Sequence, residues 1–363
     1  MERPYVADAR LPKFLKLRKS LILTLTPNPT VDRAFFVRNF RLGTVVRAER
    51  EVVTPSGKGV DSSLVIHELG GDTVAAGLNA GHTGRLLTDL LDEMHVPHDF
   101  VPACGETRTA VVLIDLSVHQ QSTVTAPTLT ATPEHLSQLL ALLDRYAPAP
   151  GPCPRGQAWG VICAGNLPPG LPPDSYAHLV RHARQRGLVT LLDSSGEPLR
   201  QGVAGPPHVL KINLDELGSL DPQMTRGRLD SDDMAGLAER LAGRLNEWAS
   251  DALIVTLGAR GALAVTPEGC FYAQPPQVPV VNTAGAGDAL NGGIMLARSR
   301  GADWAAALAL GTAAAASVVM NEGTAICRRG QVEELLPQVR VVAINRQIGK
   351  PASRQIGKSA NSK

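Results

Sequence analysis

Short runs of apolar residues, many of them β-branched, alternate along the chain with segments of helical periodicity. The runs predict strands at 21–26, 111–114, 161–163, 189–192, 209–212, 253–257 and 262–265. The amphipathic stretches 176–186 and 234–249 lie among them and predict helices. Alternation of this kind is typical of a mostly parallel sheet covered by helices on both faces. The pattern therefore predicts an α/β fold.

Three segments depart from this alternation. Residues 34–53 and 107–125 alternate apolar and polar positions without a helical period. They predict a small antiparallel β-sheet that serves as a lid. Residues 304–320 carry no charge, but they are rich in alanine and shorter than the roughly 20 residues that a bilayer span requires. We expect a buried helix there, and no membrane partner.

Charge separates the two ends of the chain from its body. Of the formal net charge of +2, residues 1–20 contribute +4 and residues 346–363 contribute +5, which leaves −7 for residues 21–345. We predict a disordered N-terminal extension at 1–20, one domain at 21–345 and a disordered basic tail at 346–363, in which a pentapeptide occurs twice. An acidic body argues against a nucleic-acid groove.

Cysteine usage and the N-terminal segment bear on the compartment. The five cysteines are odd in number and contain no Cys-x-x-Cys pair, which indicates a reducing compartment without structural zinc. Residues 10–19 lack the continuous apolar core of a signal peptide. We expect a cytoplasmic protein.

The sharpest chemical signal is the small-residue segment Gly285-Ala286-Gly287-Asp288. It follows the strand-like run 278–281 and precedes a helix-like segment. Small residues let backbone N–H groups approach an anion, and a helix N-terminus adds donors and a favourable dipole. Asp288 could then accept the proton of an attacking hydroxyl. A tight turn with Asp288 as an ordinary helix-start charge explains the segment equally well.

Two further motifs could contact a nucleotide. Thr256, Leu257, Gly258 and Gly261 form a turn between two predicted strands, where the backbone could pass close to phosphates; a plain hairpin turn is the alternative. Asn213 and Glu216 follow another strand and could orient Mg²⁺ through water. Isolated residues of this kind are more often a helix cap and a solvated acid.

Polar residues near the N-terminus could hold a sugar. Asp32 follows the first strand, at the carboxyl end where sugar hydroxyls could be bound. The Gly57-Lys58-Gly59 loop could bring backbone groups and an ammonium to a substrate phosphate. Each feature could also be a turn with ordinary capping residues.

Taken in order, the motifs resemble the ribokinase-like phosphofructokinase B family of carbohydrate kinases, in particular its 1-phosphofructokinase and tagatose-6-phosphate kinase branch. The similarity extends from about residue 21 to residue 341. The motifs that carry it are Thr24-Leu-Thr-Pro-Asn-Pro29, Gly57-Lys-Gly-Val60, Leu69-Gly-Gly71, Gly165-Asn-Leu-Pro-Pro-Gly170, Asp193-Ser-Ser-Gly-Glu197, Lys211-x-Asn213, Thr256-Leu-Gly258 and Gly285-Ala-Gly-Asp288.

The resemblance implies an α/β domain with a β-sheet lid, a homodimer formed through that lid, and Mg²⁺-dependent transfer of the γ-phosphate of ATP to a sugar hydroxyl. Asp288 matches the family's base, and 284–287 its anion hole. Residues 256–261 with Gly287 match its nucleotide contacts, and Asn213 with Glu216 its magnesium motif. Asp32 matches the acceptor of sugar hydroxyls and Arg108 a contact to substrate phosphate.

Three departures concern the sugar half. Asp61 stands where the branch usually has Asn, Ala110 replaces an Asn after Arg108, and Asn166 stands where Ser is common. We expect phosphorylation of fructose 1-phosphate or tagatose 6-phosphate. A family kinase for an unphosphorylated sugar or nucleoside, or a catalytically silent sugar-phosphate sensor, are the alternatives.

Overall fold

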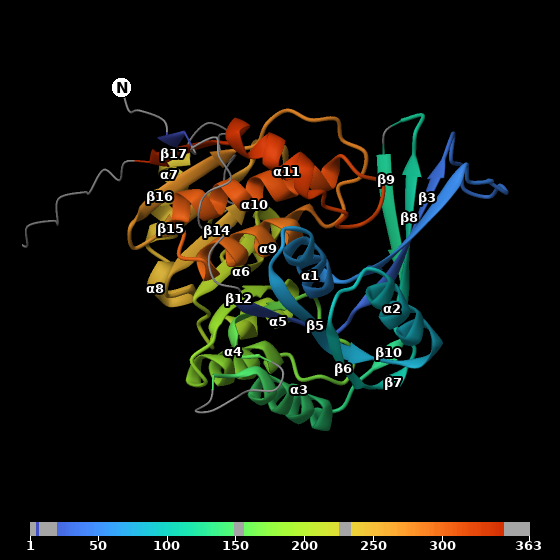
Figure 1. Cartoon of the computed structure of the whole chain (residues 1–363), viewed down its shortest axis with the longest axis horizontal. Helices are drawn as coiled ribbons and strands as arrows, with labels where there is room; N and C mark the ends of the chain where they lie inside the picture. Colours follow the sequence, from blue (N-terminus) through green and yellow to red (C-terminus); the bar gives the residue numbers. More distant parts are fainter. Residues whose placement is uncertain (1–4, 7–19, 119, 149–155, 225–233, 345–363) are drawn as a thin grey trace, which may run out of the picture.

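Parallel strands form the larger part of an eleven-stranded sheet, up to one of its edges, in the computed structural model, which describes residues 5–6, 20–118, 120–148, 156–224 and 234–344 (Figure 1). The parallel strands lie in the order β14 (Ala252–Thr256), β13 (Val209–Asn213), β12 (Val189–Asp193), β11 (Ala158–Ala164), β2 (Leu21–Thr26), β5 (Asp72–Asn79) and β6 (His98–Pro102). The antiparallel strands β15 (Ala262–Thr266), β16 (Gly269–Gln274), β17 (Arg340–Ile344) and β1 (Tyr5–Val6) extend the β14 edge. The mostly parallel sheet is confirmed.

Helices cover both faces of this sheet, as predicted. One face packs on α1 (Lys58–Glu68), α9 (Ala286–Ser299), α10 (Trp304–Val319) and α11 (Arg329–Leu335). The other packs on α3 (Pro133–Tyr146), α4 (Ser175–Gln185), α5 (Gly196–Gly202), α6 (Leu214–Leu220), α7 (Met234–Ala242) and α8 (Leu245–Trp248). Helix α2 (Gly81–Glu93) closes a smaller apolar cluster with α1. The expected buried helix at 304–320 is α10.

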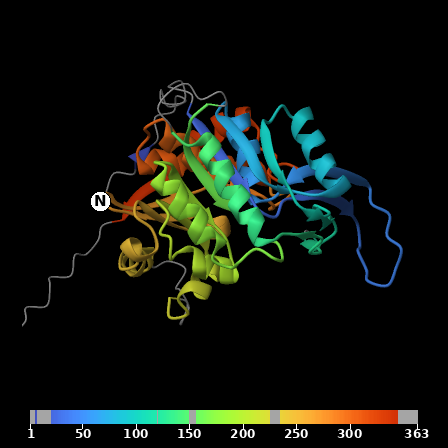
Figure 2. The same ribbon diagram turned by 90° about the horizontal axis from the view of Figure 1, so that it is seen from below.

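A second, four-stranded sheet stands beside the body (Figure 1). Its order is β4 (Arg50–Ser56), β3 (Thr30–Val37), β8 (Arg108–Asp115) and β9 (Gln120–Thr125). The prediction of an antiparallel sheet is wrong for its central pair, because β3 and β8 are parallel. Strand β3 follows β2, and β8 follows β6 after the short strand β7 (Cys104–Gly105), so both come from parallel strands of the large sheet. The long β3–β4 connection extends away from the body (Figure 2).

Three local predictions are corrected. The run 278–281 is not a strand, because Pro275, Pro276 and Pro279 lack the N–H groups that a ladder needs. The stretch 234–249 forms two helices that break at Gly243. The expected loop 57–59 is a helix start, with Gly57 as the N-cap of α1.

Helices α9 and α10 approach each other closely at a pair of glycines. A Cβ added to Gly293 would lie 2.7 Å from the Cα of Gly311, and one added to Gly311 would lie 2.7 Å from the carbonyl oxygen of Leu290. Both positions therefore require glycine.

Most of the predicted N-terminal extension and all of the predicted C-terminal tail lie outside the described residues. Tyr5 and Val6 of the extension pair with β17. Of the described helices, none has the length and apolar character to cross a membrane.

Candidate active site

The N-terminus of α9 supplies the acid predicted as the base. Gly285 caps the helix in the left-handed conformation, with φ 84°, and a Cβ there would lie 2.6 Å from the backbone N of Ala325. Asp288 is therefore the third helical residue, and it is buried. The first-turn N–H groups of a helix have no intrahelical acceptor, so Gly287 and Asp288 present donors where an anion could bind, next to Ala286 N, which makes a long contact of 3.5 Å to the Thr283 carbonyl oxygen.

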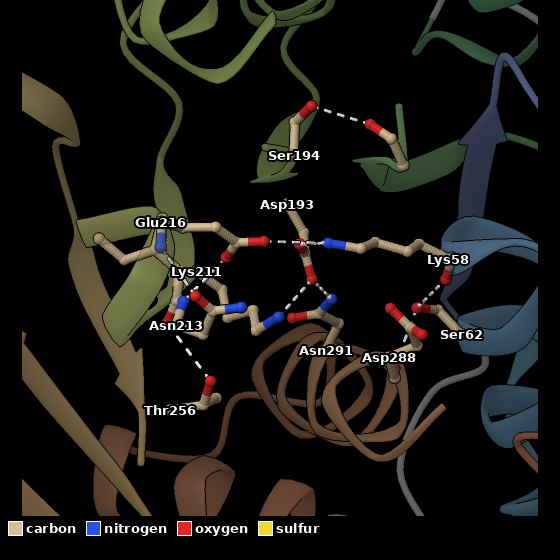
Figure 3. Close-up of polar contacts among 12 residues, drawn as sticks. Lys58, Ser62, Asp193, Ser194, Lys211, Asn213, Glu216, Thr256, Asp288 and Asn291 are labelled. Atoms are coloured by element: carbon tan, nitrogen blue, oxygen red, sulfur yellow. Dashed lines mark hydrogen bonds and ion pairs between the residues drawn. The ribbon is translucent and has the colours of Figure 1, made fainter. Parts of the chain in front are cut away.

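Asp193, at the carboxyl end of β12, is the centre of a buried charge cluster (Figure 3). Its Oδ1 accepts from Lys58 Nζ at 2.6 Å, and its Oδ2 accepts from Lys211 Nζ and Asn291 Nδ2, each at 2.7 Å. Burial alone would raise the pKa of Asp193, but Lys211 and Lys58 outweigh it and lower the pKa below its usual value. The two ammonium groups are thus fixed before any ligand arrives.

Asp288 faces this cluster and has a different electrostatic setting. Burial, reinforced by the negative charge of Asp193, raises the pKa of Asp288 to about 7, although Lys58 and Lys211 oppose the rise. A carboxylate with a pKa near neutrality can take a proton from a hydroxyl far better than an ordinary aspartate. The backbone carbonyl of Asp288 accepts from Ser62 Oγ at 3.0 Å, which ties α9 to α1.

The predicted nucleotide turn is a hairpin between β14 and β15. Leu257 N donates to the carbonyl oxygen of Gly261 at 2.8 Å, and Gly258 and Gly261 both have positive φ. A Cβ on Gly261 would lie 2.0 Å from the carbonyl oxygen of Ala273, so only glycine fits. Thr256 pairs in register with Asn213 on β13, which places this turn beside the predicted magnesium motif.

Asn213 and Glu216 form a capping box at the start of α6. Asn213 Oδ1 accepts from Glu216 N, and Glu216 Oε2 accepts from Asn213 N, each at 2.8 Å. Glu216 is buried, and its Oε1 lies 3.4 Å from Lys58 Nζ. With three oxygens so engaged, the pair fits contact to a hydrated Mg²⁺ through water and not direct ligation. Within the described residues, no group of three or more His, Cys, Asp or Glu side chains could hold a metal.

Three of the predicted sugar residues meet on the side of the site that faces the four-stranded sheet. Asp32 lies on β3 and Asp61 on α1, and both are buried. Thr324 Oγ1 donates to Asp32 Oδ2 at 2.8 Å, and Ser56 Oγ donates to Asp61 Oδ2 at 3.2 Å. Arg108 on β8 faces both carboxyl groups. Burial raises the pKa of Asp32, and its hydrogen bonds only partly offset this.

Arg108 also faces a cavity of about 440 Å³. Its Nη2 donates to the carbonyl oxygen of Asn28 at 3.2 Å and to Asn166 Oδ1 at 3.3 Å, and all three residues line the cavity. The buried Nε has no acceptor among the described residues. A cation that lines an open cavity is suited to an anionic ligand group.

Gly57 and Lys58 lie where α1 begins. A Cβ on Gly57, with φ 115°, would lie 2.9 Å from Thr26 Cγ2, so α1 starts directly against the end of β2. The side chain of Lys58 reaches Asp193 and Glu216. Its ammonium is therefore engaged at the centre of the site, beside the proposed phosphoryl position.

Residues 28–330 match the pfkB family of carbohydrate kinases, and this span contains every site residue named above. The chain belongs to the pfkB family. It is a carbohydrate kinase with the ribokinase-like fold. The chain is 31% identical over 279 residues to a tagatose-6-phosphate kinase of Staphylococcus epidermidis. The aligned region covers 76% of this chain and 84% of that protein.

Solved structures agree with the pfkB assignment. Phosphofructokinase-2 from Escherichia coli, solved with substrates and products, is 27% identical, with a TM-score of 0.78 over 87% of this chain and 98% of that one. A possible 1-phosphofructokinase from Thermotoga maritima shares the fold, at 23% identity and a TM-score of 0.75 over 90% and 100% of the two chains.

Sequence reasoning missed three members of this pfkB site: Asp193, Lys211 and Asn291. Asp193 and Lys211 were visible only as parts of motifs, although a charged residue that ends or interrupts a buried strand is itself a signal. Asn291 gave a weaker signal: it lies three residues after Asp288 and so shares its helix face.

Proposed function

We propose that this pfkB enzyme transfers the γ-phosphate of ATP to a hydroxyl of a hexose phosphate, fructose 1-phosphate or tagatose 6-phosphate, and forms the bisphosphate. The observation that carries the choice of substrate is Arg108, a half-buried cation that faces both the sugar carboxylates and the 440 Å³ cavity. The relative named as a tagatose-6-phosphate kinase supports it.

The residues perform the transfer in one displacement. The Asp288 carboxylate takes the proton of the sugar hydroxyl, and the oxygen attacks the γ-phosphorus while the bond to the β–γ bridging oxygen breaks and ADP leaves. The N–H groups of Ala286 and Gly287 stabilise the charge on the transferred group. A Cβ on Gly287 would lie 3.0 Å from Lys211 Nζ, so that ammonium adjoins the same position.

The remaining residues position the two substrates. The 256–261 hairpin supports the nucleotide, and Asp32 accepts hydrogen bonds from sugar hydroxyls. Mg²⁺ bound with the nucleotide would neutralise phosphate charge, with Asn213 and Glu216 reaching it through water.

A substrate panel tests the proposal. We expect the highest kcat/KM with ATP for fructose 1-phosphate or tagatose 6-phosphate, ahead of fructose 6-phosphate, fructose and ribose. Arg108→Ala should lower kcat/KM for the phosphorylated sugars roughly tenfold to a hundredfold, the value of hydrogen bonds to a charged group. Arg85→Ala, on the exposed outer face of α2, is the matched control.

The same panel separates the alternatives. Higher kcat/KM for a free sugar or nucleoside, with no effect of Arg108→Ala, would favour a kinase for an unphosphorylated substrate. Binding of sugar phosphate without ADP formation would favour a sensor.

We also propose a homodimer formed through the four-stranded sheet in a cytoplasmic enzyme. Exposed apolar side chains support the dimer: Leu42 is 90% exposed, Val45 87%, Val124 62% and Val118 56%, all on or beside this sheet. Light scattering should give twice the monomer mass, and Val124→Asp should lower it. A wild-type monomer at micromolar concentration would contradict the dimer.

A further inference from the structure

Helices α1 and α9 bring two carboxyl groups together, those of Asp61 and Asp288. Ser62, the residue after Asp61, donates to the backbone carbonyl oxygen of Asp288 at 3.0 Å, and the two carboxyl groups lie within hydrogen-bonding range of each other. Asp61 is 3% exposed; its Oδ2 accepts from Ser56, and no donor among the described residues reaches its buried Oδ1. Two ionised carboxylates cannot hydrogen-bond to each other, because neither has a hydrogen to donate.

The surrounding charges do not neutralise a doubly ionised pair. Asp32 on β3 adds a third carboxylate, and Arg108 on β8 is the cation that faces Asp32 and Asp61. Deeper in the site, Lys58 and Lys211 already balance Asp193 and Glu216. Like charges at contact distance in a buried site drive one carboxyl group to keep its proton.

The geometry indicates which acid keeps it. Asp288 lies at the N-terminus of α9 and faces two ammonium groups, both of which favour its ionised form. Asp61 faces Asp288 and Asp32 instead. Burial, then Asp288, then Asp32 raise the pKa of Asp61 well above its usual value, and the hydrogen bonds at Ser56 and Gly57 do not offset them.

We propose that Asp61 stays protonated in the working enzyme and donates its hydrogen to the Asp288 carboxylate, so that the two acids share one proton. Asp61 is then a positioning residue: it orients the base and lowers the proton affinity of the base, while the sugar proton goes to Asp288. After transfer both acids are protonated, until Asp288 returns its proton to solvent. This inference rests on the proposed role of Asp288.

A protonated Asp61 also removes a difficulty with the substrate. At about 4 Å, an ionised Asp61 would repel each unit charge of a sugar phosphate by about 4 kcal/mol at an effective dielectric of 20, roughly a thousandfold in binding. A neutral acid exerts no such repulsion and can still donate a hydrogen bond.

Infrared spectroscopy tests the protonation state without substrate. Difference spectra of wild type against Asp61→Asn at neutral pH should show the carbonyl band of one carboxylic acid in wild type only, and Asp89→Asn on exposed α2 should leave that band in place. In Asp288→Asn the band should persist and titrate at lower pH, because the neighbouring carboxylate is gone. Absence of the band in wild type would overturn the proposal, whatever the substrate panel shows.

The pH dependence of kcat/KM tests the functional role. Wild type should lose activity at alkaline pH as Asp61 ionises, whereas Asp61→Asn, which keeps a donor, should retain the acidic limb and lose the alkaline one. Asp61→Ala should move the acidic limb up by about one pH unit, the value of one hydrogen bond to a charged group. An alkaline limb unchanged in Asp61→Asn, in a variant that melts like wild type, would overturn the role.

Discussion

The phosphoryl half and the sugar half of the active site are both buried and charged, but they differ in how their charges are satisfied. In the phosphoryl half, both oxygens of Asp193 accept hydrogen bonds from Lys58, Lys211 and Asn291. In the sugar half, Asp32 and Asp61 each keep one buried oxygen without a donor among the described residues.

We call the phosphoryl half, around Asp193, the framework, because its charges are paired within the protein. We call the sugar half, around Asp32 and Asp61, the receptor, because its carboxylates are not. Interactions completed within the protein stabilise it whether or not substrate is bound, and they hold the ammonium groups still for the developing charge. Groups left without partners cost stability and recover it only from a ligand that supplies hydrogen bonds. Neutralising a carboxylate should therefore lower the stability of the protein in the framework, but should not lower it in the receptor.

The largest expected effect is on the framework. Asp193→Asn leaves Lys58 and Lys211 without their shared counter-charge, and breaking a buried pair in this way typically costs about 3–5 kcal/mol. Urea unfolding should show a loss of this size, together with loss of activity. The same change at exposed Asp89 is the control. Wild-type stability in Asp193→Asn would remove the distinction between the two halves.

Asp288→Asn should have the next largest effect on activity, through kcat. The substitution keeps the shape but removes the proton acceptor, so kcat should fall about 100-fold or more while nucleotide binding persists. Single-turnover kinetics and nucleotide titration measure the two quantities. Near-normal turnover would exclude Asp288 as the base.

Asp32→Asn should weaken the receptor without weakening the fold. Loss of a charged acceptor for sugar hydroxyls should lower kcat/KM about tenfold to a hundredfold, mainly through KM. Since burial already raises the pKa of Asp32, its neutral replacement should melt no lower than wild type. A large drop in melting temperature would assign Asp32 to the framework instead.

The last effect is a pH-dependent difference in stability. The pKa of Asp288 rises from 3.8 to about 7 on folding, so its contribution favours the folded state at low pH and is lost as pH rises through this range. Asp193 has a lowered pKa, and its contribution is present above its unfolded value and lost in acid. The melting temperature of Asp288→Asn relative to wild type should therefore increase between about pH 4 and pH 7 and then level off. A constant difference would contradict the raised pKa.

The sequence predicted which segments form the site better than it predicted which of their side chains contact one another. Short motifs located Asp288, Asn213 and the 256–261 turn, because strand ends and glycine turns are local properties. The contacts of Asp193 with Lys211 and Lys58 are not local: they depend on β12 lying beside β13 and on α1 packing behind the sheet.

The direction of Lys58 shows the same limit. The sequence placed Lys58 in a loop, between Gly57 and Gly59, that could bring its ammonium to the substrate phosphate. In the fold, Lys58 opens a helix against β2 and its side chain points to Asp193. Side-chain direction follows from the packing of whole elements, which no short motif encodes.

Because of the glycine contact between α9 and α10, the orientation of the Asp288 carboxylate depends on residues that no substrate touches. Gly293 lies five residues beyond Asp288 on one helix, and its neighbour Gly311 is on the other. A single methyl group at Gly311 would press on the Leu290 carbonyl, and the first turn of α9 would move with it. Substitutions at this glycine pair could therefore be used to change kcat from a distance, because they change the spacing of the two helices and with it the position of Asp288.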